Sequence, residues 1–121
     1  MAEESLRQLK DELREFARQR DWEQFHSPKN LVMALSVEAA ELLEHFQWLT
    51  EEQSRDLGDD KRCEVAYEMA DIFIYLLRLS ERLDIDLLQA VKEKMQINAE
   101  KYPADKVRGS ARKYTEYKTQ S

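Results

Sequence analysis

The 121-residue chain has little of what a β-sheet protein or a disulfide-rich protein needs. Its two glycines and two prolines are too few for the many tight turns that connect strands. The single cysteine, Cys63, excludes an internal disulfide and agrees with a reducing compartment. Charged residues make up 36% of the chain, and Leu, Ala, Glu, Lys and Arg are abundant. Since these residues favour helices, we expect an all-α fold.

Other missing features limit the partners. The formal net charge of −6 argues against binding a nucleic acid polymer, whose phosphates require a basic surface. No apolar run approaches the roughly 18–20 residues that a membrane span needs. The chain starts with Met-Ala-Glu-Glu and lacks the apolar segment of a signal peptide. We therefore expect a cytoplasmic protein that binds neither nucleic acid polymers nor membranes, whereas a small polyphosphate carried with a metal ion fits the same composition.

Apolar residues spaced by three and four predict four helices. They run from 5 to about 20, from 28 to 48, from about 60 to 83, and from the stretch after residue 84 to just before Pro103. Ser27 and Pro28 suit the start of the second helix, and Asp59 or Asp60 suits the cap of the third. Residues 1–103 thus form one predicted helical domain, followed by an irregular basic tail at 104–121.

Two acidic pairs interrupt this apolar pattern. Glu38 and Glu41 lie three residues apart in the second helix, and Glu68 and Asp71 do so in the third. On a helix this spacing places both carboxylates of a pair on one face. Taken by itself, an acid at the apolar position of Glu38 is accounted for if the side chain reaches solvent or pairs with an arginine. Four carboxylates on two apolar helices instead predict a site for a hard divalent cation that handles phosphates, Mg²⁺ before Mn²⁺.

Aromatic residues in the first connection allow two interpretations. Trp22 and Phe25 either close the end of the helical bundle or, with His26, form a loop that stacks on a nucleobase. The all-apolar run from Ile72 to Leu77 predicts burial on more than one side, by helices of this chain or of a second copy.

The acidic pairs and the aromatic connection, in the order in which they occur, resemble the motifs of the MazG-like all-α nucleoside triphosphate pyrophosphatases. Within that family, the resemblance is greater to the dCTP pyrophosphatase branch. The resemblance covers roughly residues 9–117. Beyond the acidic pairs, it rests on these segments: Arg20-Asp21-Trp22-Glu23-Gln24-Phe25-His26, Pro28-x-Asn30-Leu31, Phe46-Gln47-Trp48, Asp71-x-x-x-Tyr75, Lys94-Met95-x-Ile97-Asn98, Tyr102-Pro103 and Ser110-x-Arg112-Lys113-Tyr114.

The resemblance implies a four-helix bundle that assembles as a homodimer or a tetramer of two dimers. It implies Mg²⁺ at the four acidic residues, with Glu41 as the catalytic residue, and cleavage of dCTP or 5-modified dCTP to dCMP and pyrophosphate. The substrate-binding residues that it implies are Trp22, His26, Trp48, Tyr75, Lys94, Asn98, Arg112 and Lys113. Two alternatives stay open: a pyrophosphatase of different or broad base specificity, and a non-catalytic helical dimer that binds a structural cation.

Overall fold

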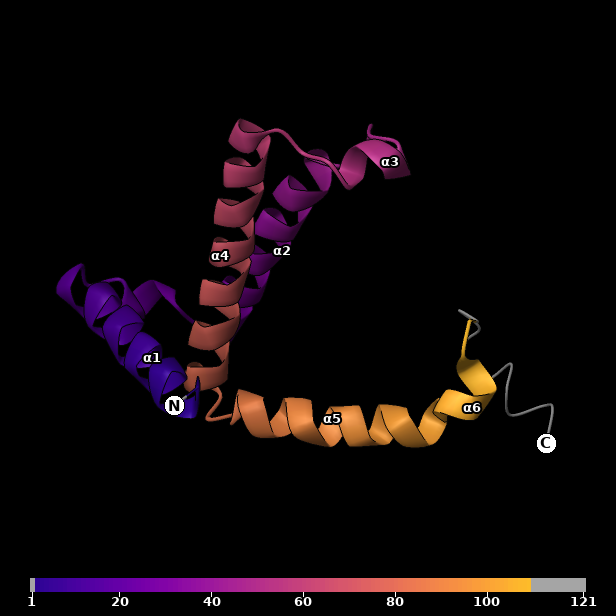
Figure 1. The fold of residues 1–121 in the computed structure, drawn as a ribbon. Helices are drawn as coiled ribbons and strands as arrows, with labels where there is room; N and C mark the ends of the chain where they lie inside the picture. Colours follow the sequence, from indigo (N-terminus) through magenta and orange to yellow (C-terminus); the bar gives the residue numbers. More distant parts are fainter. Residues whose placement is uncertain (1, 110–121) are drawn as a thin grey trace. The chain divides into compact units, whose positions relative to one another are not determined.

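The computed structural model describes residues 2–109, and every regular secondary-structure element in that range is a helix (Figure 1). The elements are α1 (Ala2–Gln19), the 3-10 turn η1 (Glu23–Phe25), α2 (Pro28–Glu44), α3 (Glu51–Ser54), α4 (Asp59–Arg82), α5 (Leu87–Lys101) and α6 (Ala104–Val107). The four long helices are those that the apolar spacing predicts. The expectation of an all-α fold is therefore confirmed.

Side-chain caps explain where several helices begin. The Ser27 hydroxyl accepts a hydrogen bond from the Asn30 amide at the start of α2, and Pro28 occupies the first turn. The Asp86 carboxylate accepts from the Gln89 amide at the start of α5. The prediction for α4 was wrong, because its N-cap is Gly58, without a side-chain cap. Both expected aspartates lie in the first helical turn instead, where their charge favours the helix dipole.

The core of the first compact unit, which ends at Ile85, lies where α4 meets α1 and α2. Figure 1 shows α2 running beside α4, with the 3-10 turn between α1 and α2. Leu31 of α2 and Leu77 of α4 are each 1% exposed, and Ala17 and Val65 are also buried. Packing of α2 on α4 brings together the two helices that carry the acidic pairs.

The second compact unit begins at Asp86. It contains α5 and the short helix α6. The expectation that the chain turns irregular at residue 104 was wrong, since α6 follows directly after Pro103. Residues 110–121, the greater part of the predicted basic tail, lie outside the described residues.

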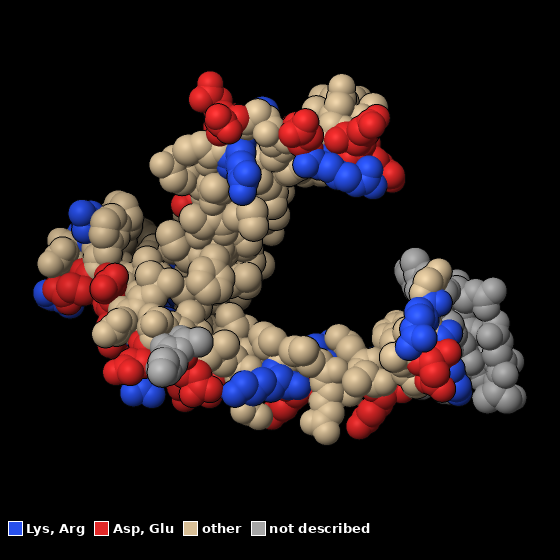
Figure 2. Space-filling view, in the orientation of Figure 1, with Lys and Arg blue, Asp and Glu red and all other residues tan. Residues whose placement is uncertain are grey.

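Many apolar side chains of α2 and α4 remain exposed in the single chain. Figure 2 shows a broad surface along these helices that carries few charged side chains between its charged ends. Met33 and Val37 on α2 are more than half exposed, as are Tyr67 and Met69 on α4. No helix in the described part of the chain combines the length and hydropathy required to cross a membrane.

Candidate functional site

Packing of α2 against α4 gathers three of the four predicted acidic ligands. Glu38 and Glu41 lie one helical turn apart on α2, and Glu68 lies on α4. Each offers one carboxylate oxygen, and these three oxygens lie within 4.8 Å of one another. The described residues contain no other group of three or more acidic, histidine or cysteine side chains this close together. Such a set of oxygen donors suits a hard cation such as Mg²⁺ or Mn²⁺.

Two oxygens of this group are buried without a partner. Oε2 of Glu38 and Oε2 of Glu68 accept no hydrogen bond from any described residue. Contact with Glu68, burial and the neighbouring Glu41 together raise the pKa of Glu38 to about 7. Carboxylates in contact disfavour each other's ionisation, and a buried acceptor without a donor costs free energy. The donor set and its unsatisfied oxygens therefore fit a bound cation.

Asp71 and Tyr75 lie further along α4 from Glu68. Asp71 is not one of the three grouped acids, but its charge still raises the pKa of Glu38. Tyr75 is half-buried, and burial raises the pKa of its phenol, with smaller effects from Glu38 and Asp71. The phenol thus stays protonated beside the acidic residues and can donate a hydrogen bond to an oxygen.

The connection between α1 and α2 is built to present its aromatic residues. Asp21 adopts a left-handed conformation with φ 52°, which reverses the chain after α1. The Asn30 side chain donates a 3.0 Å hydrogen bond to the carbonyl oxygen of Phe25 and ties η1 to α2. The rings of Trp22 and His26 lie 6.5 Å apart, and the Trp22 indole is 45% exposed. Within one chain, Trp22 is therefore only partly a core residue and keeps an open surface.

The remaining predicted substrate residues lie on other segments of the chain than the acidic group. Trp48 lies beyond the C-terminal end of α2 and is 87% exposed. Lys94 and Asn98 are exposed one helical turn apart on α5, in the second unit. Arg112 and Lys113 lie outside the described residues.

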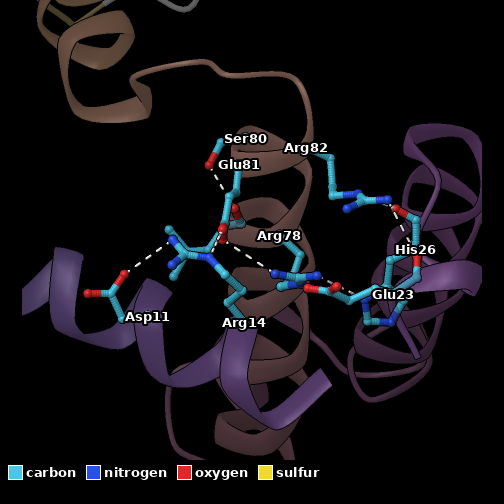
Figure 3. Close-up of polar contacts among 9 residues, drawn as sticks. Asp11, Arg14, Glu23, His26, Arg78, Ser80, Glu81 and Arg82 are labelled. Atoms are coloured by element: carbon cyan, nitrogen blue, oxygen red, sulfur yellow. Dashed lines mark hydrogen bonds and ion pairs between the residues drawn. The ribbon is translucent and has the colours of Figure 1, made fainter. Parts of the chain in front are cut away.

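A polar network at the C-terminal end of α4 was not predicted from the sequence (Figure 3). Arg78 is 3% exposed and contacts both Glu81 and the His26 ring. Glu81 in turn pairs with Arg14 of α1. Arg82 donates to the carbonyl oxygens of His26 and Glu23 at 3.0 and 3.4 Å. A cation directly after the apolar run 72–77 was the signal that pointed to a buried charge.

The chain is similar to a known protein family and to several known proteins. Residues 33–117 match the model of the MazG-like family. Over 104 residues the chain is 48% identical to dCTP pyrophosphatase 1 of Homo sapiens and 47% identical to that of Mus musculus. These matches cover 84% of this chain but 61% of each relative, so the chain spans about three fifths of their length.

A solved structure agrees in fold. A pyrophosphatase from Archaeoglobus fulgidus superposes on the chain with a TM-score of 0.78 and 43% sequence identity. The superposition covers 82% of this chain and 93% of the archaeal one.

Proposed function

Because the chain belongs to the MazG-like family, we propose that it is a Mg²⁺-dependent nucleoside triphosphate pyrophosphohydrolase. It cleaves between the α- and β-phosphates and releases a nucleoside monophosphate and pyrophosphate. The observation that carries this function is the group of Glu38, Glu41 and Glu68, with two buried oxygens that lack partners. The name of its mammalian relatives, dCTP pyrophosphatase 1, supports dCTP as the substrate. We extend the proposal to 5-modified dCTP and to a role in cleaning the nucleotide pool. Such a substrate agrees with the expected cytoplasmic location.

The three grouped glutamates would hold the cation, with Asp71 as the fourth ligand. At these carboxylates Mg²⁺ would supply neutralisation of the phosphate oxygens and polarisation of the attacked phosphorus. The chain's own contribution is to place the carboxylates on two helices that are packed together, so that their positions are fixed before the substrate arrives. Mn²⁺ meets the same oxygen donors and is the alternative ion.

Glu41 is our candidate for the catalytic carboxylate. It belongs to the acidic group, whereas Oε2 of Glu38 and of Glu68 are the buried oxygens that most need the cation. A carboxylate beside the phosphates orients the attacking water and accepts its proton. Tyr75 stays protonated next to the acids and donates to a sugar or phosphate oxygen.

The other predicted residues are assigned to contacts with the base, sugar and phosphates of the nucleotide. Trp22 and Trp48 offer exposed indole surface for stacking on the base, and His26 provides a ring nitrogen for its edge. The phosphate and sugar contacts are assigned to residues of the C-terminal part, which are Lys94, Asn98, Arg112 and Lys113.

We also propose that the working protein is a four-helix bundle that assembles as a homodimer or a tetramer of two dimers. The exposed apolar side chains of α2 and α4 support this assembly, because a monomer rarely leaves so continuous an apolar surface in water. Light scattering coupled to size-exclusion chromatography measures the mass directly. A monomer at micromolar concentration would contradict the assembly.

The activity is tested with a panel of canonical and 5-modified nucleoside triphosphates in the presence of Mg²⁺. Pyrophosphate and orthophosphate are assayed separately. We expect pyrophosphate as the direct product and the highest kcat/KM for dCTP or a 5-modified dCTP. Direct release of orthophosphate would contradict cleavage between the α- and β-phosphates.

The two alternatives give different outcomes in this assay. Turnover with another preferred base keeps the enzyme class and rejects the dCTP assignment. A higher melting temperature with Mg²⁺, without turnover of any triphosphate, indicates a structural cation in a non-catalytic helical dimer.

A further inference from the structure

Arg78 places a guanidinium group in the interior of the first unit. Its side chain is 3% exposed, and it follows the apolar run of α4. Nη1 lies 3.4 Å from Oε2 of Glu81, and Nη2 lies 3.5 Å from Nδ1 of His26. Nε has no hydrogen-bond partner among the described residues. Burying a charge with so few partners is costly, so the site is not explained by stability alone.

In the hydrogen bond between Arg78 and His26, only one assignment of donor and acceptor is possible. A guanidinium group carries five N–H donors and no acceptor. Nδ1 of His26 must therefore accept, which requires that it carries no proton. In a neutral imidazole the proton then lies on Nε2, the nitrogen on the other side of the ring. Arg78 thus selects one of the two neutral tautomers.

The charges around His26 favour the same neutral state. From α4, Arg78 and Arg82 both oppose a positive charge on the ring, and Glu23 of the 3-10 turn is the one neighbouring acid that favours it. Burial and the two arginines lower the pKa of His26 against this smaller effect of Glu23. These surroundings therefore favour the neutral ring over the charged one.

The same helix also fixes the backbone that carries the ring. Arg82 donates from Nε to the carbonyl oxygen of His26 at 3.0 Å, and from Nη2 to that of Glu23 at 3.4 Å. Glu81, which holds Arg78 from the opposite side, is itself paired with Arg14 of α1 (Figure 3). Side chains of α4 thus hold both the main chain of the turn and the ring nitrogen.

We propose that Arg78 is a positioning residue, which locks His26 as the neutral tautomer with its proton on Nε2. In this state His26 offers a single uncharged N–H donor that is suited to an acceptor atom of the nucleotide, either on the pyrimidine edge or on the sugar. The tautomer follows from the contacts of the free protein, whereas its use toward a nucleotide rests on the proposed function.

The tautomer is measured without any nucleotide. The chain has two histidines, so ¹⁵N-histidine labelling gives two ring signals, and a His45→Gln variant assigns them. We expect His26 of the wild type to show the nitrogen shifts of a neutral ring protonated on Nε2. A proton on Nδ1, or a charged ring at pH 7, overturns the proposal, whatever any variant does.

Variants then test whether Arg78 causes this state. Arg78→Met should raise the pKa of His26 and mix its two tautomers, while Arg78→Lys, which keeps the charge without the planar fork, should retain part of the shift. Arg55→Gln is the matched control, because Arg55 is an exposed arginine whose ion pair is with Glu51 of α3, away from His26 in the sequence. Circular dichroism verifies that each variant keeps its helices. An unchanged His26 titration in a folded Arg78→Met protein overturns the proposal.

Kinetics with dCTP test the use of the donor. Loss of one hydrogen bond should raise KM about 2- to 12-fold in Arg78→Met and leave kcat per folded molecule nearly unchanged. Arg78→Met should add nothing further in a His26→Ala background, because the two residues act as one unit. Full additivity of the two changes overturns the assignment.

Substrate preference separates the two acceptor positions. A changed preference among bases places the acceptor on the pyrimidine edge, and a changed preference between ribose and deoxyribose places it on the sugar. Because the tautomer is read from the free protein, a wild type without turnover contradicts the proposed function and leaves the role of Arg78 intact.

Discussion

Glu38 on α2 and Glu68 on α4 contact each other across the helix pair, and each has a buried carboxylate oxygen without a hydrogen-bond partner among the described residues. Two carboxylates this close cannot both ionise without a large cost. The metal-free site is therefore destabilised by its own charges at neutral pH. A divalent cation relieves this repulsion and satisfies the oxygens at the same time.

Mg²⁺ should raise the melting temperature of the wild type, because binding to the folded state alone stabilises it. Glu68→Gln should lose most of this gain and should melt higher than the wild type in the absence of metal, since one of the clustered charges is removed. Differential scanning fluorimetry with and without EDTA measures both effects. Glu52→Gln, an exposed glutamate of α3, is the control that keeps the full Mg²⁺ gain. An equal gain in Glu68→Gln would contradict a metal site at this position.

The metal-free protein should also lose stability as the pH rises. The pKa of Glu38 is raised from 4.5 to about 7 in the folded state, so the folded chain keeps a proton that the unfolded chain releases. The stability that this proton contributes is complete below pH 4.5 and is lost as the pH rises through about 7. In EDTA, the melting temperature of Glu38→Gln should therefore increase relative to the wild type across this window. A difference independent of pH would show that Glu38 titrates normally.

Glu41→Gln should abolish most turnover while the protein stays folded. Loss of the carboxylate that accepts a proton from water typically reduces the rate about 100-fold or more. Replacement by the isosteric amide also removes one clustered charge, so we expect an unchanged or higher melting temperature without metal. Pyrophosphate release and light scattering are measured on the same sample. Near-wild-type turnover would place the catalytic centre elsewhere.

The acidic site was predictable from sequence because its signal is local. Spacing of three residues on a helix fixes a common face, and an acid at an apolar position requires a reason. Glu38, Glu41 and Glu68 follow from this rule, and the structure brings them together. Asp71 obeys the same spacing but lies outside the closest group, because the exact approach of two helices is set by packing and not by periodicity.

The network around Arg78 was not predictable in the same way. Its partners are separated by long stretches of chain: His26 lies 52 positions earlier, and Arg14 lies 67 positions before Glu81. No spacing rule connects such residues, since their proximity depends on how α1 and the 3-10 turn pack on α4. The N-cap of α4 was also predicted incorrectly. Gly58 occupies the N-cap position in an extended conformation and makes no side-chain cap hydrogen bond, whereas an aspartate was expected there.

Substitution of Trp22 and Trp48 tests whether the two indoles form a base pocket or pack the end of the helical bundle. A fully buried tryptophan changed to alanine costs about 3–5 kcal/mol of stability. Trp22 is 45% and Trp48 is 87% exposed in the single chain, so neither has the burial that such a cost requires. We therefore expect Trp48→Ala to change the melting temperature little and Trp22→Ala to lower it moderately.

Activity should show the larger effect of both changes. Stacking on an aromatic side chain contributes about 1–3 kcal/mol per base, which corresponds to about 5- to 150-fold in binding. KM for dCTP should rise by this factor in Trp22→Ala and Trp48→Ala, with kcat less affected. Gln24→Ala is the control for a general disturbance of the loop, because Gln24 is exposed on the same 3-10 turn, bonds to Asp21 and has no assigned contact with the base.

His26→Ala completes this test, because the imidazole is expected to contact the edge of the base or the sugar instead of stacking. Its substrate preference should change more than its melting temperature, whereas the two tryptophan variants should weaken all bases to a similar extent. Melting temperature, oligomer mass and kcat/KM are measured together for Trp22→Ala, Trp48→Ala and His26→Ala. A large drop in melting temperature with unaltered preference and KM would contradict the pocket. It would assign the aromatic residues to packing instead, within the chain if the mass is unchanged and between chains if the oligomer dissociates.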